Sequence, residues 1–244
     1  PPRSTLFPYT TLFRSPVRIG GIAKGAGMIH PNMATMLCFI TTDAAITGPV
    51  LKQALNDAVN LSFHMITVDG DTSTNDTVAM LANGHAGNAV IDAATGPAYK
   101  KFTEVLTQIC IYLAQQVVRD GEGATKFLAI TVKGAADFAD AKAAAMAVAK
   151  SPLVKTAFFG QDPNWGRIAC AAGYSGARLD AEKTSLAIGG VTLVQNGVGA
   201  KWEPKELQKI MAAKDIKVEI DLGVGASEAT VWTCDFSYDY VKIN

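Results

Sequence analysis

The sequence predicts an α/β fold, because segments patterned as strands are followed by segments with the spacing of amphipathic helices. Residues 36–42 form an apolar run typical of a buried strand, and in residues 49–63 the apolar side chains recur at helical intervals. Residues 126–133 alternate as a strand does, and the alanine-rich residues 136–151 again predict a helix. A chain of 244 residues can bury the core of one domain or of two small ones.

The remaining elements are expected in the following order. Residues 69–76, rich in Asp, Ser and Thr, predict a loop that uses Asx turns and caps a helix over residues 77–82, rather than a cation site. Residues 98–118 predict a long amphipathic helix, and Pro152 is expected to end the helix before it. Further along we expect a loop at 161–167, strands at 185–194 and 217–222, a helix at 203–213 and an alternating strand over 229–244.

The composition excludes several classes of protein. Lys and Arg together number 22, as do Asp and Glu, so the formal charge is zero. This balance, without a basic run, argues against a nucleic-acid partner, and no apolar stretch approaches the ~20 residues of a membrane span. We therefore expect a cytoplasmic protein with no nucleic-acid or membrane partner.

The cysteines and histidines do not predict a metal centre. The four cysteines lie far apart among apolar residues, which is typical of reduced core thiols in a cytosolic protein. The three histidines lack the paired spacing of a zinc site, so we expect structural roles for them. These residues are Cys38, Cys110, Cys170 and Cys234, and His30, His64 and His85.

Thr35 is the candidate nucleophile, since it lies in an apolar run shortly after a Gly-rich turn at residues 25–27. A threonine hydroxyl needs a base, and the amine freed by cutting the preceding peptide bond can serve as one. That amine has a reference pKa of roughly 7.7 to 8.0, close to working pH. From the residues alone, the start of a buried strand remains the more ordinary interpretation of this threonine.

Four sequence blocks carry a family resemblance. Residues 17–24 read Val-Arg-Ile-Gly-Gly-Ile-Ala-Lys, and Gly-Ala-Gly-Met and Pro-Asn-Met-Ala-Thr-Met-Leu follow at 25–28 and 31–37. Residues 66–77 read Ile-Thr-Val-Asp-Gly-Asp-Thr-Ser-Thr-Asn-Asp-Thr. Residues 119–126 read Arg-Asp-Gly-Glu-Gly-Ala-Thr-Lys, and residues 158–167 read Phe-Phe-Gly-Gln-Asp-Pro-Asn-Trp-Gly-Arg. In this order they resemble the ornithine acetyltransferases, the bifunctional glutamate N-acetyltransferases of arginine biosynthesis. Several blocks in order, between residues 17 and 244, are far more specific than one short motif.

The resemblance implies a mixed-sheet, layered α/β fold of the self-processing ornithine acetyltransferase and aminopeptidase superfamily. Such precursors cut themselves before the threonine, here between Ala34 and Thr35. Residues 17–34 would then be the tail of an α chain and residues 35–244 a β chain. The two chains stay associated, and a heterotetramer of two α and two β chains is expected.

The resemblance also implies the reaction and its residues. Thr35 would take the acetyl group of N-acetylornithine and pass it to glutamate, with no bound cofactor, and bifunctional members also use acetyl-CoA as a substrate. Lys24, Thr35, Glu122 and Asn244 correspond to substrate-binding positions. Lys24 can meet a carboxylate, and Glu122, in a glycine-flanked turn, can meet the ammonium of ornithine. Without the resemblance, solvated surface charges would be the ordinary interpretation of both.

The sequence also departs from the family pattern. Residues 1–16 do not resemble the family and are expected to be a foreign segment. The Thr-Gly pair of the family's oxyanion hole has no counterpart here, and such donors are typically worth ~10² to 10³ in rate. Two alternatives therefore remain: a self-processed amidohydrolase or aminopeptidase, and an inactive fragment that exposes an apolar patch. The loop at 161–167, with Trp165 and Arg167, could shape a pocket or simply pack under a turn.

Overall fold

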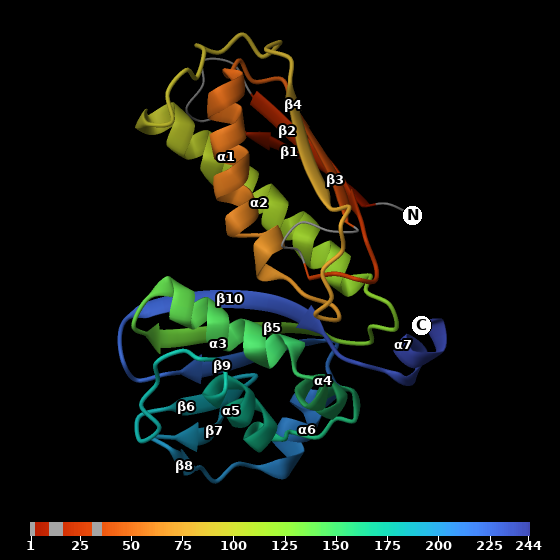
Figure 1. Cartoon of the computed structure of the whole chain (residues 1–244), viewed down its shortest axis with the longest axis vertical. Helices are drawn as coiled ribbons and strands as arrows, with labels where there is room; N and C mark the ends of the chain where they lie inside the picture. Colours follow the sequence, from red (N-terminus) through yellow and green to blue (C-terminus); the bar gives the residue numbers. More distant parts are fainter. Residues whose placement is uncertain (1–2, 10–16, 31–35) are drawn as a thin grey trace. The chain divides into compact units, whose positions relative to one another are not determined.

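The computed structural model describes residues 3–9, 17–30 and 36–244. The described chain divides into two units (Figure 1). Unit 1 comprises the described residues up to Ile66 together with Asp71–Val117, and unit 2 comprises Thr67–Gly70 and Val118–Asn244. Because each unit has its own sheet, the two are described separately.

Unit 1 is built on a four-stranded sheet in the order β1-β2-β3-β4. The first three strands pair antiparallel, whereas β3 and β4 run parallel. Helices α1 and α2 cover one face, as Figure 1 shows, and the Tyr99 hydroxyl of α2 donates to Asp57 of α1 at 2.8 Å. The strands are β1 Arg3–Tyr9, β2 Val17–Lys24, β3 Leu37–Thr42 and β4 Thr77–Ala82, and the helices are α1 Gly48–Asn60, the 3₁₀ helix η1 Phe63–Met65 and α2 Gly96–Arg119.

Close packing of α2 against this sheet depends on a small residue in β2. A Cβ placed on Gly21 would lie 2.7 Å from the Leu113 side chain of α2. Real Cβ atoms do not approach so closely, so the glycine allows the helix to settle on the strand. The resulting core of unit 1 is lined by Ile19, Cys38, Ile40, Ala54, Phe102, Leu106 and Ile109.

Two expectations for unit 1 need correction or comment. The helix expected over residues 77–82 is wrong, because this segment is strand β4 and pairs in parallel with β3. Parallel neighbours are joined by a long crossover, so the partner of such a short apolar run is invisible to local periodicity. Within the segment expected to be foreign, β1 pairs antiparallel with β2 along its whole length. The origin of residues 1–16 stays a prediction.

Unit 2 is built on a six-stranded sheet in the order β10-β5-β9-β6-β7-β8, in which only β5 and β9 run parallel. Figure 1 shows α3 and α5 on the same face of this sheet. The strands are β5 Phe127–Ala135, β6 Ser185–Ile188, β7 Val191–Gln195, β8 Val198–Gly199, β9 Asp215–Asp221 and β10 Ser227–Cys234. The helices are α3 Phe138–Lys150, α4 Pro152–Phe159, α5 Trp165–Gly173, α6 Pro204–Ala212 and α7 Tyr238–Ile243.

Unit 2 corrects two further expectations and extends a third. The single strand expected at 185–194 is a hairpin, since Gly189 and Gly190 take φ values of +58° and +87° between β6 and β7. Pro152 ends α3 but also begins α4, where its fixed φ suits the first helical turn. The strand expected over 229–244 is wrong beyond Cys234, because Ser237 caps a short helix there. The other predicted helices and strands are confirmed to within a few residues.

Candidate active site

Lys24 lies at one end of the unit 1 sheet. It is the last residue of β2, is exposed, and pairs across the sheet with Leu37, the first residue of β3. Leu37 in turn pairs with Thr77, the first residue of β4. Thr35 precedes Leu37 by two residues in the sequence, but Ala34 and Thr35 lie outside the described residues. Their predicted roles therefore remain predictions.

The loop before β4 forms hydrogen bonds with His30 and with Met36, the described residues nearest to Thr35 in the sequence. The Thr72 hydroxyl donates to the His30 carbonyl oxygen at 3.2 Å. On the other side, the backbone N–H of Met36, directly after Thr35, donates to the Asp76 carboxylate. Asp76 is buried, and this burial raises its pKa, opposed by the Met36 hydrogen bond and by the positive charge of Lys24.

Asp76 is a residue whose role the sequence did not reveal. The sequence pattern predicts Asx turns and a helix cap at this position, but the element that follows Asp76 is strand β4 and not a helix. Its carboxylate instead accepts the backbone N–H of Met36, one residue after the candidate nucleophile, and interacts with the positive charge of Lys24. Only the resemblance of the whole block could have indicated this, because the partner lies 40 residues earlier in the chain.

Glu122 lies at the tip of a tight turn in unit 2. The turn is closed by a hydrogen bond from the Ala124 N–H to the Gly121 carbonyl oxygen at 3.0 Å. Gly123 takes a φ of +66°, and a Cβ there would lie 2.4 Å from the backbone nitrogen of Tyr240. Glycine is therefore required at this position, both for its backbone conformation and for the close approach of α7.

Asn244 lies at the end of α7 and meets Glu122 directly. Its Nδ2 donates to Glu122 Oε2 at 3.1 Å and to the Tyr240 carbonyl oxygen at 3.2 Å. Both bonds use the amide nitrogen, so the amide oxygen is turned away from the carboxylate. A carboxylate beside an oriented amide is a suitable binding group for an ammonium. The structure thus brings together two predicted site residues that are 122 positions apart.

The structure describes three of the four predicted binding residues. Unit 1 contains Lys24, and unit 2 contains the Glu122–Asn244 pair. Thr35 lies outside the described residues.

The segment 161–167 proves to be mainly structural. Asn164 accepts a hydrogen bond from the backbone of Arg167 and so caps α5, which begins at Trp165. The Arg167 guanidinium donates to the Leu153 carbonyl oxygen of α4 at 2.8 Å. Of the two interpretations, packing around a turn is therefore the one that the contacts favour.

The cysteines differ in burial. Cys38, Cys110 and Cys234 are buried as expected, and burial raises the pKa of Cys38 to about 12. Cys170 is exposed on α5, so its assignment to the core is wrong. The apolar neighbours of Cys170 in the sequence predicted burial, but they lie on other faces of the helix.

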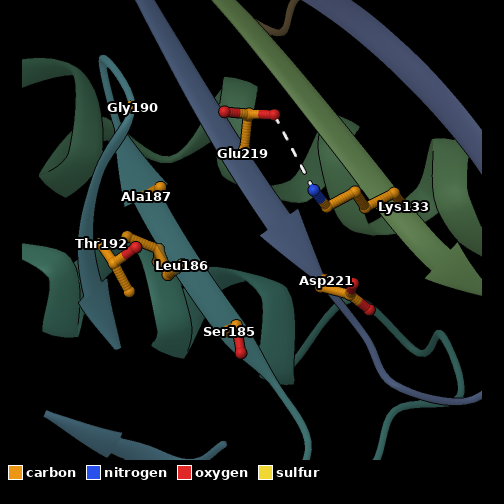
Figure 2. Close-up of a pocket in the computed structure, with 8 residues that line it drawn as sticks. All are labelled: Lys133, Ser185, Leu186, Ala187, Gly190, Thr192, Glu219 and Asp221. Carbon is orange, nitrogen blue, oxygen red and sulfur yellow. Dashed lines mark ion pairs between the residues drawn. The ribbon is translucent and has the colours of Figure 1, made fainter. Parts of the chain in front are cut away.

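A separate hollow of about 250 Å³ lies on the outer face of the six-stranded sheet. Figure 2 shows Lys133 of β5 extending toward Glu219 of β9, with an Nζ to carboxylate distance of 3.9 Å. None of the predicted site residues lines it. The lining residues are Lys133, Ser185, Leu186, Ala187, Gly190, Thr192, Glu219 and Asp221.

The described residues contain neither a cluster of metal ligands nor a helix suited to a membrane. Across residues 3–9, 17–30 and 36–244, no three His, Cys, Asp or Glu side chains gather closely enough to hold a metal ion. In the same part of the chain, no helix is both long enough and apolar enough to cross a membrane.

Comparison with known proteins decides the family. A sequence model of the ArgJ family matches residues 4–244. The chain belongs to the ArgJ family. This confirms the resemblance to the acetyltransferases of arginine biosynthesis. The match also begins inside the segment 1–16, which was expected to be foreign.

Curated ArgJ proteins are similar along most of this chain. The arginine biosynthesis bifunctional protein ArgJ of Symbiobacterium thermophilum is 50% identical over 228 residues, which are 93% of this chain and 56% of that protein. The ArgJ protein of Geobacter sulfurreducens is 53% identical over 93% of this chain and 58% of its own length. The mitochondrial ArgJ protein of Schizosaccharomyces japonicus is 49% identical over 93% and 53%. The chain therefore spans little more than half the length of these relatives.

A solved structure confirms the α/β fold. The crystal structure of the arginine biosynthesis bifunctional protein argJ from Bacillus halodurans matches with a TM-score of 0.82 and 41% identity. The match covers 84% of this chain and 97% of that chain.

Proposed function

We propose that the protein, when complete, transfers the acetyl group of N-acetylornithine to glutamate through an acetyl ester on Thr35. The observation that carries this proposal is the contact between Glu122 and Asn244. Both lie at positions where the resemblance implies substrate binding, and together they form a binding group suited to the ammonium of ornithine. Membership of the ArgJ family supports the same assignment.

The chemistry proceeds in two balanced steps. The Thr35 hydroxyl oxygen attacks the acetyl carbonyl carbon, and the freed α-amine of Thr35 takes the hydroxyl proton and passes it to the leaving amine of ornithine. The C–N bond breaks, ornithine leaves, and the acetyl group remains as an ester. The amine of glutamate then attacks this ester, forms N-acetylglutamate and restores the threonine. In this scheme Lys24 binds a substrate carboxylate.

Self-cleavage between Ala34 and Thr35 forms part of the proposal, with residues 17–34 and 35–244 as pieces of the α and β chains. The lengths of the relatives support it. The solved chain is matched over 97% of its length by only 84% of this chain, so it is shorter than the present chain. The curated relatives are well over one and a half times as long as this chain. A separate β chain would account for both facts.

The partner of the β chain in this proposal is an α chain, in a heterotetramer of two α and two β chains that acts in the cytoplasm. In this proposal the α chain supplies the oxyanion hole. No resident cofactor is needed, because the acetyl group arrives on N-acetylornithine. Acetyl-CoA is proposed as a second acetyl donor for glutamate, and N-acetylglutamate formed from acetyl-CoA without N-acetylornithine would establish this.

The proposal can be tested with the chain produced together with the N-terminal half of the Symbiobacterium relative. Ornithine release from N-acetylornithine should depend on glutamate and should yield N-acetylglutamate. Acetate release without glutamate would instead establish the hydrolase alternative. No turnover of N-acetylornithine in this complex would contradict the proposed function.

The role of Glu122 can be tested in the same preparation. Glu122→Gln should raise the KM for N-acetylornithine roughly 10- to 100-fold, because a charge-assisted hydrogen bond is worth ~1.5–3 kcal/mol. Glu228→Gln, at an exposed position of β10, is the matched control and should leave KM unchanged. Equal effects of the two substitutions would contradict the role of Glu122.

A further inference from the structure

The turn that carries Glu122 is fixed by a fully buried carboxylate, Asp235, directly after β10. One oxygen of Asp235 accepts the backbone N–H groups of Thr125 and Lys126, each at 2.8 Å. The other oxygen accepts the Thr125 hydroxyl. A buried carboxylate is tolerated only when it is well hydrogen-bonded, so these three donors bind Asp235 tightly to the exit of the turn.

Ser237, two residues further along, holds the tip of the same turn. Its hydroxyl donates to the Gly123 carbonyl oxygen at 2.6 Å and accepts the Asp239 N–H at 3.2 Å. The second bond caps α7, the helix that ends at Asn244. One short segment after β10 therefore fixes both the Glu122 turn and the start of the helix that carries Asn244.

This segment is itself anchored by Lys155 of α4, whose side chain is fully buried. The Lys155 ammonium donates to the Thr233 hydroxyl at 2.9 Å and to the Cys234 carbonyl oxygen. It also lies 4.5 Å from the ring centroid of Phe236, whose backbone N–H donates to the Lys155 carbonyl oxygen at 3.3 Å. These contacts hold the backbone on both sides of Asp235.

We propose that Asp235 is a positioning residue that holds the turn presenting Glu122 to Asn244, with Lys155 as the anchor of the segment that carries it. A glutamate between two glycines has wide backbone freedom, and ordering it in advance lowers the entropy lost when substrate binds. Asp235 itself touches no substrate in this arrangement. The inference deepens the proposed function and rests on the binding role given there to Glu122.

The test uses Asp235→Asn in the complex with the N-terminal half of the Symbiobacterium relative. The amide oxygen of Asn can still accept the two backbone N–H groups, but without the negative charge, and the amide nitrogen cannot accept the Thr125 hydroxyl. The turn should therefore loosen. We expect the KM for N-acetylornithine to rise about tenfold, with a smaller change in kcat. Thr125→Val removes one of the three donors at an exposed position and should give the same effect at a smaller size without unfolding the protein.

Two controls separate positioning from general stability. Asp239→Asn alters a nearby exposed aspartate whose carboxylate pairs with Lys242 at 2.9 Å, and it should leave KM unchanged. In a Glu122→Gln background, Asp235→Asn should change KM less than twofold, because its effect acts through Glu122. Amide hydrogen exchange at Ala124 and Thr125 should quicken in Asp235→Asn and not in Asp239→Asn.

The outcomes distinguish failure of this inference from failure of the proposed function. A complex that turns over N-acetylornithine, with a normal KM and normal exchange in Asp235→Asn, would overturn the positioning role alone. Full multiplication of the Asp235→Asn and Glu122→Gln effects would also overturn it. A wild-type complex that does not turn over N-acetylornithine would overturn the proposed function and the inference with it.

Discussion

The two sheets leave very different outer faces. In unit 1 the face away from α1 and α2 carries large apolar side chains: Ile22, Phe39 and Leu81 are 38%, 47% and 61% exposed. Ile22 pairs directly with Phe39 across β2 and β3, so their side chains point the same way. In unit 2 the corresponding face carries charged and hydroxyl groups, among them Lys133, Thr192, Glu219 and Asp221.

Under the proposed function, this difference predicts which sheet meets the α chain. A sheet with one polar face can expose that face to water, as the mostly antiparallel sheet of unit 2 can. Exposed large apolar side chains on one sheet face are what a second layer of protein usually covers, and burying each of them contributes about 1.5–3 kcal/mol. The expectation that an isolated fragment exposes an apolar patch therefore applies to unit 1, whereas unit 2 assembles Glu122 and Asn244 from its own contacts.

The largest expected effect comes from placing a charge on the apolar face. Phe39→Lys should weaken association with the N-terminal half of a relative at least 100-fold, because the charge would be buried without a partner. Thr192→Lys, at an exposed position on the outer face of unit 2, is the control and should have no effect. Sedimentation of the complex measures both. If both variants associated equally well with the N-terminal half, the outer face of the unit 1 sheet would not be its binding surface.

The next largest effect should come from disrupting the close approach of α7 to the turn that carries Glu122. Gly123→Ala places a Cβ 2.4 Å from the Tyr240 nitrogen at a φ of +66°, so α7 should be displaced and unfolding should become easier by about 3 kcal/mol. Gly176→Ala has a similar φ of +82° but meets nothing within 4 Å, and should cost only about 1 kcal/mol. Urea denaturation compares the two variants. Similar losses would mean that α7 does not depend on this close approach.

The smallest effect concerns the buried lysine of unit 2. Burial lowers the pKa of Lys155, so the unfolded chain binds its proton more tightly than the folded chain does. Stability contributed by this group is therefore complete above its ordinary pKa of 10.5 and is lost as pH falls through the lowered value. Between pH 9 and pH 10, the free energy of unfolding of wild type should rise relative to that of Lys155→Met by at most about 1.4 kcal/mol. Urea denaturation measures this difference in the free energy of unfolding. The same difference between wild type and Lys155→Met at both pH values would contradict the prediction.

Local pattern was sufficient where an element is long or clearly capped, as for α2 and α3. It failed for β4, since a short run that is apolar after Thr77 does not indicate which parallel strand it pairs with. It correctly ended a helix before Pro152, but it did not predict that the same residue begins α4. Sequence alone favoured a strand through the C-terminus, where the Ser237 cap instead begins a helix.

The candidate site, too, could be predicted from the sequence only in part. Lys24, Glu122 and Asn244 could be named only through a family resemblance, since each resembles an ordinary surface residue by itself. The Asp235 and Ser237 bonds that hold the Glu122 turn join positions more than 100 residues apart, so no local pattern could indicate them. Asp76 and Lys155 were missed because their roles come from partners brought together by folding.

The most direct test of the central claim is an intact mass of the chain, alone and in complex with an N-terminal half, after incubation with N-acetylornithine. In the complex we predict cleavage between Ala34 and Thr35 and one added acetyl group on the chain that begins at Thr35. Thr35→Ala should remain uncut and unacetylated. An uncut wild-type chain in the complex, or an acetyl group carried by Thr35→Ala, would contradict the account.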